Sequence, residues 1–329
     1  MTVQRQRLHL MLATAAAAVG LASAPAMAQG SYPSKTVLMI VPAAAGGTTD
    51  LAGRMAAQAL APVIGQSVVV DNKGGGNGAI AANLVKRADA DGYTLLMQYS
   101  GYHVISPHLT KARSWEQSDF APVANVLSAP QIIVVRSELP VKTLAELVSY
   151  TKANPGKLNY ATSGNGTIVH LNTAAFAAQA GIQLAHVPYK GTAQSITDLA
   201  AGQVHLLFDS IPTGMPHVAS GRLRALAVTG DRRSTLAPNL PTVAESGLPG
   251  YSSVTWFGLY GPAGMKPELV GRINQAFNRA IQNPEVIASL AKQGVEPAKP
   301  QTPGQFAAMV QADSARWAKV IRDNHITLE

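Results

Sequence analysis

The sequence predicts an α/β protein in which mainly parallel sheets are flanked by helices. Short apolar strands alternate with amphipathic helices almost to the end of the chain, as they do in βαβ units. Two of these strands run through a glycine-containing turn directly into a helix. The 329 residues can bury a large core, and chains of this length usually divide into two lobes.

Strands and helices alternate regularly in the N-terminal part. Strands are expected at 36–41, 68–71 and 93–97, and helices at 51–60 and 79–87. A loop-rich piece that contains two prolines follows the third strand.

The same alternation continues toward the C-terminus. Thr143 is the expected N-cap of one helix, with Glu146 at the capping-box position. A Pro/Gly-rich stretch at 238–250 is expected to cross between lobes. The remaining strands are expected at 131–136, 158–162, 184–187, 204–208, 223–228 and 254–260, and the helices at 144–152, 170–180, 193–201, 267–282 and 303–324.

The first 28 residues have the pattern of a secretory signal peptide. Arg5 and Arg7 precede an apolar, alanine-rich stretch at 10–21, and Ala26-Met27-Ala28 forms a small-x-small cleavage site. We therefore expect cleavage after Ala28 and export to the periplasm. The alternative is an uncleaved membrane anchor. The chain has no cysteine, which excludes a lipoprotein anchor, disulfides and thiolate chemistry.

The composition indicates an ordinary globular protein with a preference for anions. Hydrophobic residues make up 47% and charged residues 13% of the chain, and the formal net charge is +8. A basic surface favours anionic partners at long range. Lys and Arg do not cluster with aromatic residues, so nucleic acid is not expected. The eight histidines show no metal-ligand spacing, and no metal site is expected.

The turn after the first strand is the strongest local candidate for a binding site. Gly46 and Gly47 allow a ligand to approach the backbone closely. Thr48 or Thr49 can cap the following helix and still donate a hydroxyl, and the helix start carries partial positive charge. This turn can therefore hold a carboxylate or phosphate. The alternative is a plain capped connection between strand and helix.

A second turn of similar design runs from Ser163 to Thr167. It offers hydroxyl, amide and backbone donors that suit a carboxylate without adding charge; the candidate ligand contacts are Ser163, Asn165, Gly166 and Thr167. If each lobe contributes one turn, two helix starts face each other across a cleft and hold one anion.

Aromatic residues at strand ends are candidate pocket walls, because ligands of open α/β sheets bind there. They are Tyr99, Tyr102, Tyr189 and Trp256, and each could equally be a packing residue. Asp209 ends another strand, where it could accept from a ligand hydroxyl or amine or cap the next turn.

Two enzymatic interpretations are weaker. The run Gly74-Gly75-Gly76-Asn77-Gly78-Ala79 matches a dinucleotide-binding pattern, but the acid expected at the end of the next strand is missing. Ser163 and His170 lie on one turn without a nucleophile elbow. We therefore expect neither catalysis nor a cofactor, and keep a dinucleotide-dependent enzyme as a remote alternative.

Runs spread over the whole chain after residue 31 carry a family resemblance. They include Tyr32-Pro33-Ser34-Lys35, Gly46-Gly47-Thr48-Thr49-Asp50 with Arg54, Asp91-Gly92-Tyr93-Thr94-Leu95-Leu96, Ser163-Gly164-Asn165-Gly166-Thr167 with His170-Leu171, Val187-Pro188-Tyr189-Lys190-Gly191 and Pro241-Thr242-Val243-Ala244-Glu245. In this order and spacing, the chain resembles the periplasmic solute-binding proteins of tripartite tricarboxylate transporters, also called the Bug family.

The resemblance implies a two-lobed periplasmic-binding-protein fold, type II-like, that closes on a small organic anion. We expect lobe 1 at residues 31–127 and 252–329 and lobe 2 at 128–251. The implied function is capture of a carboxylate, by a monomer, for delivery to integral membrane transporter subunits. A binding module that serves a membrane sensor is the alternative.

Four positions depart from the family pattern. Ala43, Ala44 and Ala45 stand where family members commonly carry an aromatic residue and prolines, which predicts a bulkier or more apolar ligand than a four-carbon diacid. Thr192 replaces a small residue and makes the contacts of its loop uncertain.

Overall fold

The computed structural model describes residues 32–43, 45, 48–110, 113–189, 192–292 and 295–327. Residues 1–35 and residues 36–329 are separate compact units, and the second unit contains every element discussed below. The predicted signal peptide lies outside the described residues. Within the described ranges, every helix is too short or too polar to span a bilayer.

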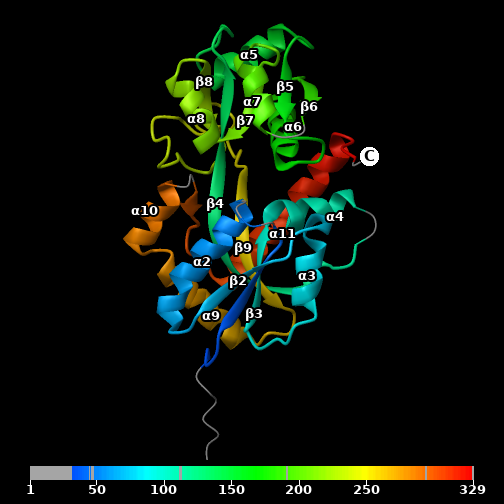
Figure 1. Cartoon of the computed structure of the whole chain (residues 1–329). Coiled ribbons are helices and arrows are strands. Elements are labelled where there is room, and N and C mark those ends of the chain that lie inside the picture. Colours follow the sequence, from blue (N-terminus) through cyan, green and yellow to red (C-terminus); the bar gives the residue numbers. More distant parts are fainter. Residues whose placement is uncertain are drawn as a thin grey trace, which may run out of the picture. The chain divides into compact units, whose positions relative to one another are not determined.

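A mixed sheet of ten strands organises residues 36–329 (Figure 1). We divide it into two halves at its longest strand, β4 (Phe120–Arg136). The sheet A half contains β1 (Val37–Val41), β2 (Val68–Asn72), β3 (Thr94–Tyr99), β9 (Val254–Pro262) and β10 (Glu296–Pro297). The sheet B half contains β5 (Asn159–Thr162), β6 (Ala185–Pro188), β7 (Leu206–Ser210) and β8 (Leu223–Val228).

Strand β4 belongs to both halves. From Phe120 to Pro130 it pairs with β9, and from Gln131 to Arg136 it pairs with β7 and β8. The sequence predicted only the second part, because Pro122 and Pro130 lack an N–H group for the ladder. The strand tolerates Pro122 at a shift in register between β4 and β9.

The predicted α/β class is confirmed, and the sheet is mixed. β1 is parallel to β2 and β3, and β5 is parallel to β6 and β7. The antiparallel pairs of the described strands all involve β4 or β9. Each half therefore keeps a parallel βαβ core, and the two long strands that join the halves introduce the antiparallel pairs. The predicted lobe boundaries stay a prediction.

Helices cover both halves. Thr143 caps α5 as predicted, since its hydroxyl accepts the Glu146 N–H at 3.2 Å. Three short helices were not predicted (α4, α8 and α10); each has a proline in its first turn, and Pro216 also lies inside α8. The helices are α2 (Thr48–Ile64), α3 (Ala79–Lys86), α4 (Ser106–Leu109), α5 (Leu144–Ala153), α6 (Ile168–Ala180), α7 (Thr192–Ala200), α8 (Ile211–Ala219), α9 (Pro267–Ala280), α10 (Pro284–Lys292) and α11 (Pro303–Asp323).

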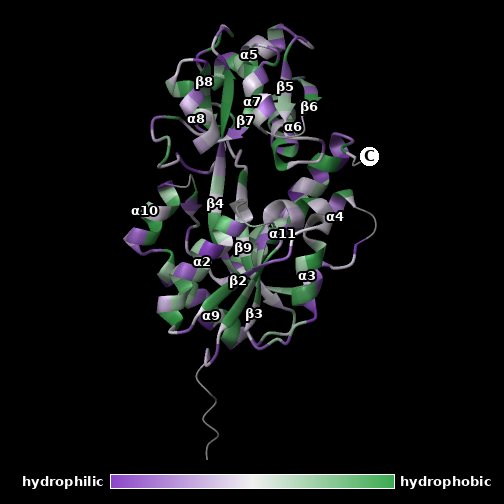
Figure 2. Cartoon of the chain, in the orientation of Figure 1, coloured by the Kyte–Doolittle hydropathy of each residue, from purple (hydrophilic) through white to green (hydrophobic). Residues whose placement is uncertain are grey.

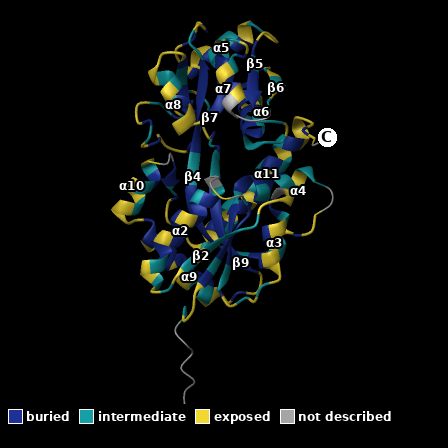
Figure 3. Ribbon diagram, viewed as in Figure 1, coloured by how far each residue is buried: buried dark blue, intermediate teal, exposed yellow. Residues whose placement is uncertain are grey.

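Each half has its own apolar core, which Figures 2 and 3 show as hydrophobic, buried strands beneath helices with polar outer faces. In the sheet B half, Phe176 and Phe208 are fully buried against residues 132–135 of β4. In the sheet A half, Phe306 and Trp317 of α11 are fully buried beside Tyr260. The stretch at 238–250, which connects β8 to β9, packs on the sheet B core through Val243.

A capping box begins α11, and its contribution to stability can be tested. The Thr302 hydroxyl accepts the Gln305 N–H at 3.2 Å, and the Gln305 side chain accepts the Thr302 N–H at 2.9 Å. We expect Thr302→Ala to lower the free energy of unfolding by about 1 kcal/mol in urea denaturation. Thr302→Ser keeps the hydroxyl and should have little effect; equal losses in both variants would contradict the capping role.

Candidate functional site

A cavity of about 370 Å³ lies where β4 and β9 run between the two halves, and we call it the front cavity. Residues from both halves and from the joining strands line it: Thr49, Tyr99, Tyr102, Ala129, Pro130, Gln131, Ile168, Ser210, Pro212, Thr255, Phe257 and Val295. Its volume is that of a site for a small molecule.

Three helices begin at the front cavity. Thr49 lies in the first turn of α2, Ile168 is the first residue of α6, and Ser210 is the N-cap of α8. Helix starts expose N–H groups that have no partner within the helix and carry partial positive charge. The amides of Ile168 and Val169 donate to no described residue. These helix starts therefore direct hydrogen-bond donors toward the cavity.

The described lining of the front cavity contains no Asp, Glu, Lys, Arg or His. This described lining thus offers a negative ligand dipoles and no formal cation. Hydroxyl groups of Thr49 and Thr255 add neutral donors to those of the helix starts, whereas the Ser210 hydroxyl lies 2.7 Å from the Thr213 hydroxyl.

Gln131 is a polar side chain of the cavity that the sequence analysis missed. It is buried, and its Oε1 accepts a hydrogen bond from Asn172 Nδ2 of α6. Asn172 is itself held by the Ser253 hydroxyl, which donates to its Oδ1. With Oε1 occupied, Gln131 retains Nε2, which donates to no described residue. The network thus presents an oriented amide donor to the cavity.

One wall of the front cavity is aromatic. The Tyr99 ring lies edge to face with Tyr102 at 5.1 Å between centroids, and 6.0 Å from Phe257. Burial raises the pKa of the Tyr99 hydroxyl, and the neighbouring Tyr102 adds to this rise. Gly101 permits the arrangement, because a Cβ at this position would lie 2.3 Å from the Tyr99 ring. The wall suits the apolar body of a ligand.

The structure describes the first predicted turn in part. Gly46 and Gly47 lie outside the described residues, and the side chain of Thr48 is not described. Thr49 lines the front cavity, and its contact with a ligand stays a prediction. Asp50 accepts hydrogen bonds from Arg54 at 3.0 Å and Asn72 at 2.9 Å.

Asn72 connects this helix start to the preceding loop. Its Nδ2 also donates to the Ala43 carbonyl oxygen at 3.0 Å. The buried Asp50 carboxylate is thus part of a network that holds the loop after β1 against α2. Asp50 therefore supports the first predicted turn indirectly, through its hydrogen bond with Asn72, which also bonds to Ala43.

The second predicted turn lies directly before Ile168, at the edge of the front cavity. Some of its donors are satisfied by residues of the turn and of the helix that follows. The Thr167 hydroxyl donates to the Gly164 carbonyl at 2.8 Å, and the Gly166 N–H donates to His170 Nδ1 at 3.2 Å. The amides of Ser163 and Asn165 donate to no described residue. None of the four predicted contacts lines the cavity, so their role in binding stays a prediction.

A stack of rings supports the second turn from beneath. His170 and His186 are nearly parallel, with 4.0 Å between centroids, and Tyr160 stacks on His186 at 5.0 Å. His186 Nε2 lies 2.7 Å from the Thr162 hydroxyl, which also accepts the Gly164 N–H at 3.2 Å. Burial, with a contribution from His186, lowers the pKa of His170 to about 4. His170 is therefore neutral near pH 7, as its acceptor role requires.

The other predicted side chains lie outside the lining of the front cavity. The Tyr189 hydroxyl donates to Asp198 at 2.9 Å, and Trp256 projects from the opposite face of β9. Asp209 is buried and accepts from the Thr213 hydroxyl at 2.7 Å in the first turn of α8. Burial raises the pKa of Asp209. Of the predicted aromatic walls, Tyr99 and Tyr102 line the cavity.

The glycine run at 74–78 forms a 3₁₀ turn at Gly76–Gly78 before α3. Gly76 and Ala79 line a cavity of about 70 Å³, which is too small for a dinucleotide. Among the described residues, no group of three His, Asp or Glu side chains is placed to hold a metal ion.

A family model described as the tripartite tricarboxylate transporter family receptor matches residues 52–326. The chain belongs to this family. The resemblance in the sequence is thus confirmed. The chain is also 34% identical over 301 residues to protein BugT of Bordetella pertussis, covering 91% of this chain and 92% of BugT.

Solved structures of similar proteins share the fold. Rpa4515 of R. palustris, determined with adipate, is 36% identical with a TM-score of 0.71, over 90% of this chain and 99% of that one. MatC of Rhodopseudomonas palustris, with bound malate, is 30% identical with a TM-score of 0.66, over 88% and 100%. Both neighbours of this receptor family therefore hold a carboxylate.

The lowered pKa of His170 predicts a pH dependence of stability. The unfolded chain binds a proton at His170 near the ordinary pKa of 6.5, whereas the folded chain does so only near 4. Stability is therefore lost as the pH falls from 6.5 toward 4. His170→Gln keeps an acceptor for Gly166 and removes the proton site. Solvent reaches part of the ring, so the effect is smaller than the full pKa shift would give. We expect the free energy of unfolding of His170→Gln to fall by about 1–2 kcal/mol less than that of wild type between about pH 7.5 and about pH 4.5.

Chemical denaturation at both pH values measures this difference. His325→Gln, at an exposed histidine, is the control and should leave the loss unchanged. An equal loss in wild type and His170→Gln would contradict the neutral state of His170.

Proposed function

We propose that this chain is a periplasmic solute-binding protein that captures a small organic carboxylate in the front cavity and delivers it to a tripartite tricarboxylate-type membrane transporter. The main support for this proposal is the arrangement of neutral donors around the front cavity. They come from three helix starts and from the Gln131 amide. The carboxylates bound by Rpa4515 and MatC support the same class of ligand.

Neutral donors give such a site its selectivity. One helix start contributes about 0.3–1 kcal/mol to an exposed anion and up to about 2 kcal/mol when partly buried. Several converging donors are therefore needed. A ligand without a carboxylate would leave these donors buried and unpaired, at about 1–3 kcal/mol each. The proposed ligand contacts remain those predicted around Thr49 and Ser163–Thr167, with Gln131 added.

The lining favours a ligand with an apolar body. Tyr99, Tyr102 and Phe257 form one wall, and Pro130, Pro212 and Ile168 add further apolar surface. This agrees with the hypothesis drawn from Ala43–Ala45, where smaller side chains leave room. Methylene groups of a longer diacid, or an aromatic ring, would pack on this surface.

The proposal also covers export, oligomeric state and membrane partners. We infer export by a signal peptide with cleavage after Ala28, and action as a monomer. The family match supports a receptor that works with membrane subunits. A binding module that reports to a membrane sensor would use the same cavity. Co-purification with integral membrane subunits distinguishes the two.

Isothermal titration calorimetry with a set of carboxylates tests the function. We expect adipate to bind more tightly than succinate, because two further buried methylenes contribute about 0.8 kcal/mol each, or about fifteenfold together. Adipamide, which lacks the charge, should not bind. Failure of every mono-, di- and aromatic carboxylate to bind would refute the proposal; tighter binding of succinate or malate would refute the apolar preference alone.

Gln131→Glu tests the predicted donor. The change keeps the acceptor for Asn172 but replaces the Nε2 donor by a second carboxylate oxygen, in a cavity whose described lining holds no cation. We expect the Kd for the bound carboxylate to rise by about 100-fold or more, because like charges at close range cost several kcal/mol. Gln203→Glu, at an exposed position in the same half, is the matched control. Equal affinity in Gln131→Glu and wild type would exclude Gln131 from the site.

A further inference from the structure

A second cavity lies on the opposite face of the two joining strands. It measures about 360 Å³, and we call it the rear cavity. Successive side chains of a strand point to opposite faces. On β9, Thr255 and Phe257 therefore line the front cavity, whereas Val254 and Trp256 line the rear one. On β4, Ala129 faces the front cavity and Ser128 the rear one.

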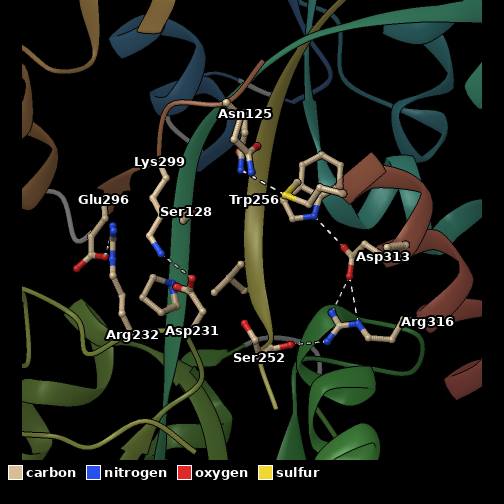
Figure 4. A pocket seen from close by; sticks show the side chains of 16 residues that line it. Asn125, Ser128, Asp231, Arg232, Ser252, Trp256, Glu296, Lys299, Asp313 and Arg316 are labelled. Atoms are coloured by element: carbon tan, nitrogen blue, oxygen red, sulfur yellow. Dashed lines mark hydrogen bonds and ion pairs between the residues drawn. The ribbon is translucent and has the colours of Figure 1, made fainter. Parts of the chain in front are cut away.

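Three polar bridges surround the rear cavity, and Figure 4 shows their side chains. Lys299 forms an ion pair with Asp231 at 2.9 Å. Arg232 lies 3.9 Å from Glu296. Arg316 Nη1 donates to the Ser252 carbonyl oxygen at 2.5 Å. We call these three contacts the rear bridges.

Each rear bridge joins the sheet A half to the sheet B half. On the sheet A side, Glu296 lies in β10, which pairs with β4 at Ser128, and the Ala298 N–H donates to Val126. Arg316 lies on α11. On the sheet B side, all three partners belong to the segment 229–253, which packs on the sheet B core through Ala237, Val243 and Tyr251.

Two of the bridges are supported by further bonds. Glu296 is buried, and its Oε1 accepts from the Ser234 hydroxyl at 2.8 Å and from the Thr235 N–H at 2.7 Å, both across the same boundary. Asp313 holds Arg316 at 2.7 Å and also accepts from Trp256 Nε1 at 2.8 Å. The charges around the rear cavity are thus paired and oriented.

We propose that the rear bridges hold the two halves apart at the front cavity and thereby lower the affinity for the ligand. Because the two cavities lie on opposite faces of β4 and β9, a rotation about these strands that narrows the front cavity widens the rear one. Widening of the rear cavity separates the two partners of each rear bridge. A ligand that closes the front cavity must therefore overcome these contacts, and the equilibrium between the two forms depends on their strength. The inference rests on the proposed function insofar as it concerns ligand affinity.

The Lys299–Asp231 pair offers the sharpest test, because both side chains are more than half exposed and their removal leaves no buried charge unpaired. Lys299→Met and Asp231→Asn each remove the pair. They change the net charge in opposite directions, so a shared effect cannot come from long-range attraction of the anion. Arg233→Met is the matched control, since it removes the exposed Arg233–Glu245 pair, which lies within the 229–253 segment.

The separation of the halves can be measured without any ligand. The chain has no cysteine, so spin labels attach only at Gln58→Cys on α2 and Lys152→Cys on α5, both exposed. Double electron–electron resonance then gives the distance distribution between the halves. We expect Lys299→Met and Asp231→Asn to shift the population toward shorter distances and Arg233→Met to leave it unchanged. No shift, or the same shift in the control, would overturn the proposal.

Calorimetry with adipate provides the second measurement. We expect each bridge variant to lower the Kd about two- to fivefold, the range of an exposed pair, and the double variant to lower it no further. Wild-type affinity in both variants, with unchanged distances, would refute the rear bridges and leave the proposed function intact. Shifted distances in a protein that binds no carboxylate would support the bridges and refute the proposed function.

Discussion

The alternation of side chains along β4 and β9 is the constraint on which the rest of the molecule depends. These two strands connect the halves, and each presents one face to the front cavity and the other to the rear cavity. A one-residue slip in their pairing would exchange Thr255 and Phe257 with Val254 and Trp256. The long ladder from Phe120 to Pro130, which packs against α9 and α11, opposes such a slip.

The helix starts and side chains around these strands supply the hydrogen-bond donors of the front cavity. Helix starts converge on it from both halves, and the network from Ser253 through Asn172 to Gln131 orients a side-chain amide. None of these groups carries a formal charge. Burying a lysine or arginine in the empty cavity would cost desolvation energy, which neutral N–H and O–H donors avoid.

Local patterns were sufficient to predict the strand, glycine turn and helix units. β1 with α2 and β5 with α6 each lie within a few residues of the predicted bounds, because apolar runs and glycine turns are local signals. The length of β4 and the existence of α8 could not be predicted in the same way. Pro130 and Pro216 argue against regular structure locally, and only pairing and packing with distant segments stabilise them there.

In the candidate site, too, local signals predicted some residues, whereas others depend on contacts with distant parts of the chain. Thr49 and Tyr99 follow directly from their positions at a helix start and a strand end, and both line the cavity. Gln131 depends on Asn172, 41 residues further along the chain, and no local motif reports that contact. Its position at the point where β4 changes partner, directly after Pro130, is the signal that could have indicated it. Asp209 is buried near the end of β7, where its carboxylate accepts from Thr213 of the next helix, and it does not line the cavity.

The lack of charged side chains in the lining that the structure describes also separates the rate at which an anion arrives from the strength with which it is held. Attraction at a distance comes from the excess of basic residues over the whole chain, which dissolved ions screen within about 8 Å at physiological ionic strength. Dipoles in contact with the ligand act over one hydrogen-bond length and are screened far less. In concentrated salt the molecule would meet its solute less often yet release it at nearly the same rate.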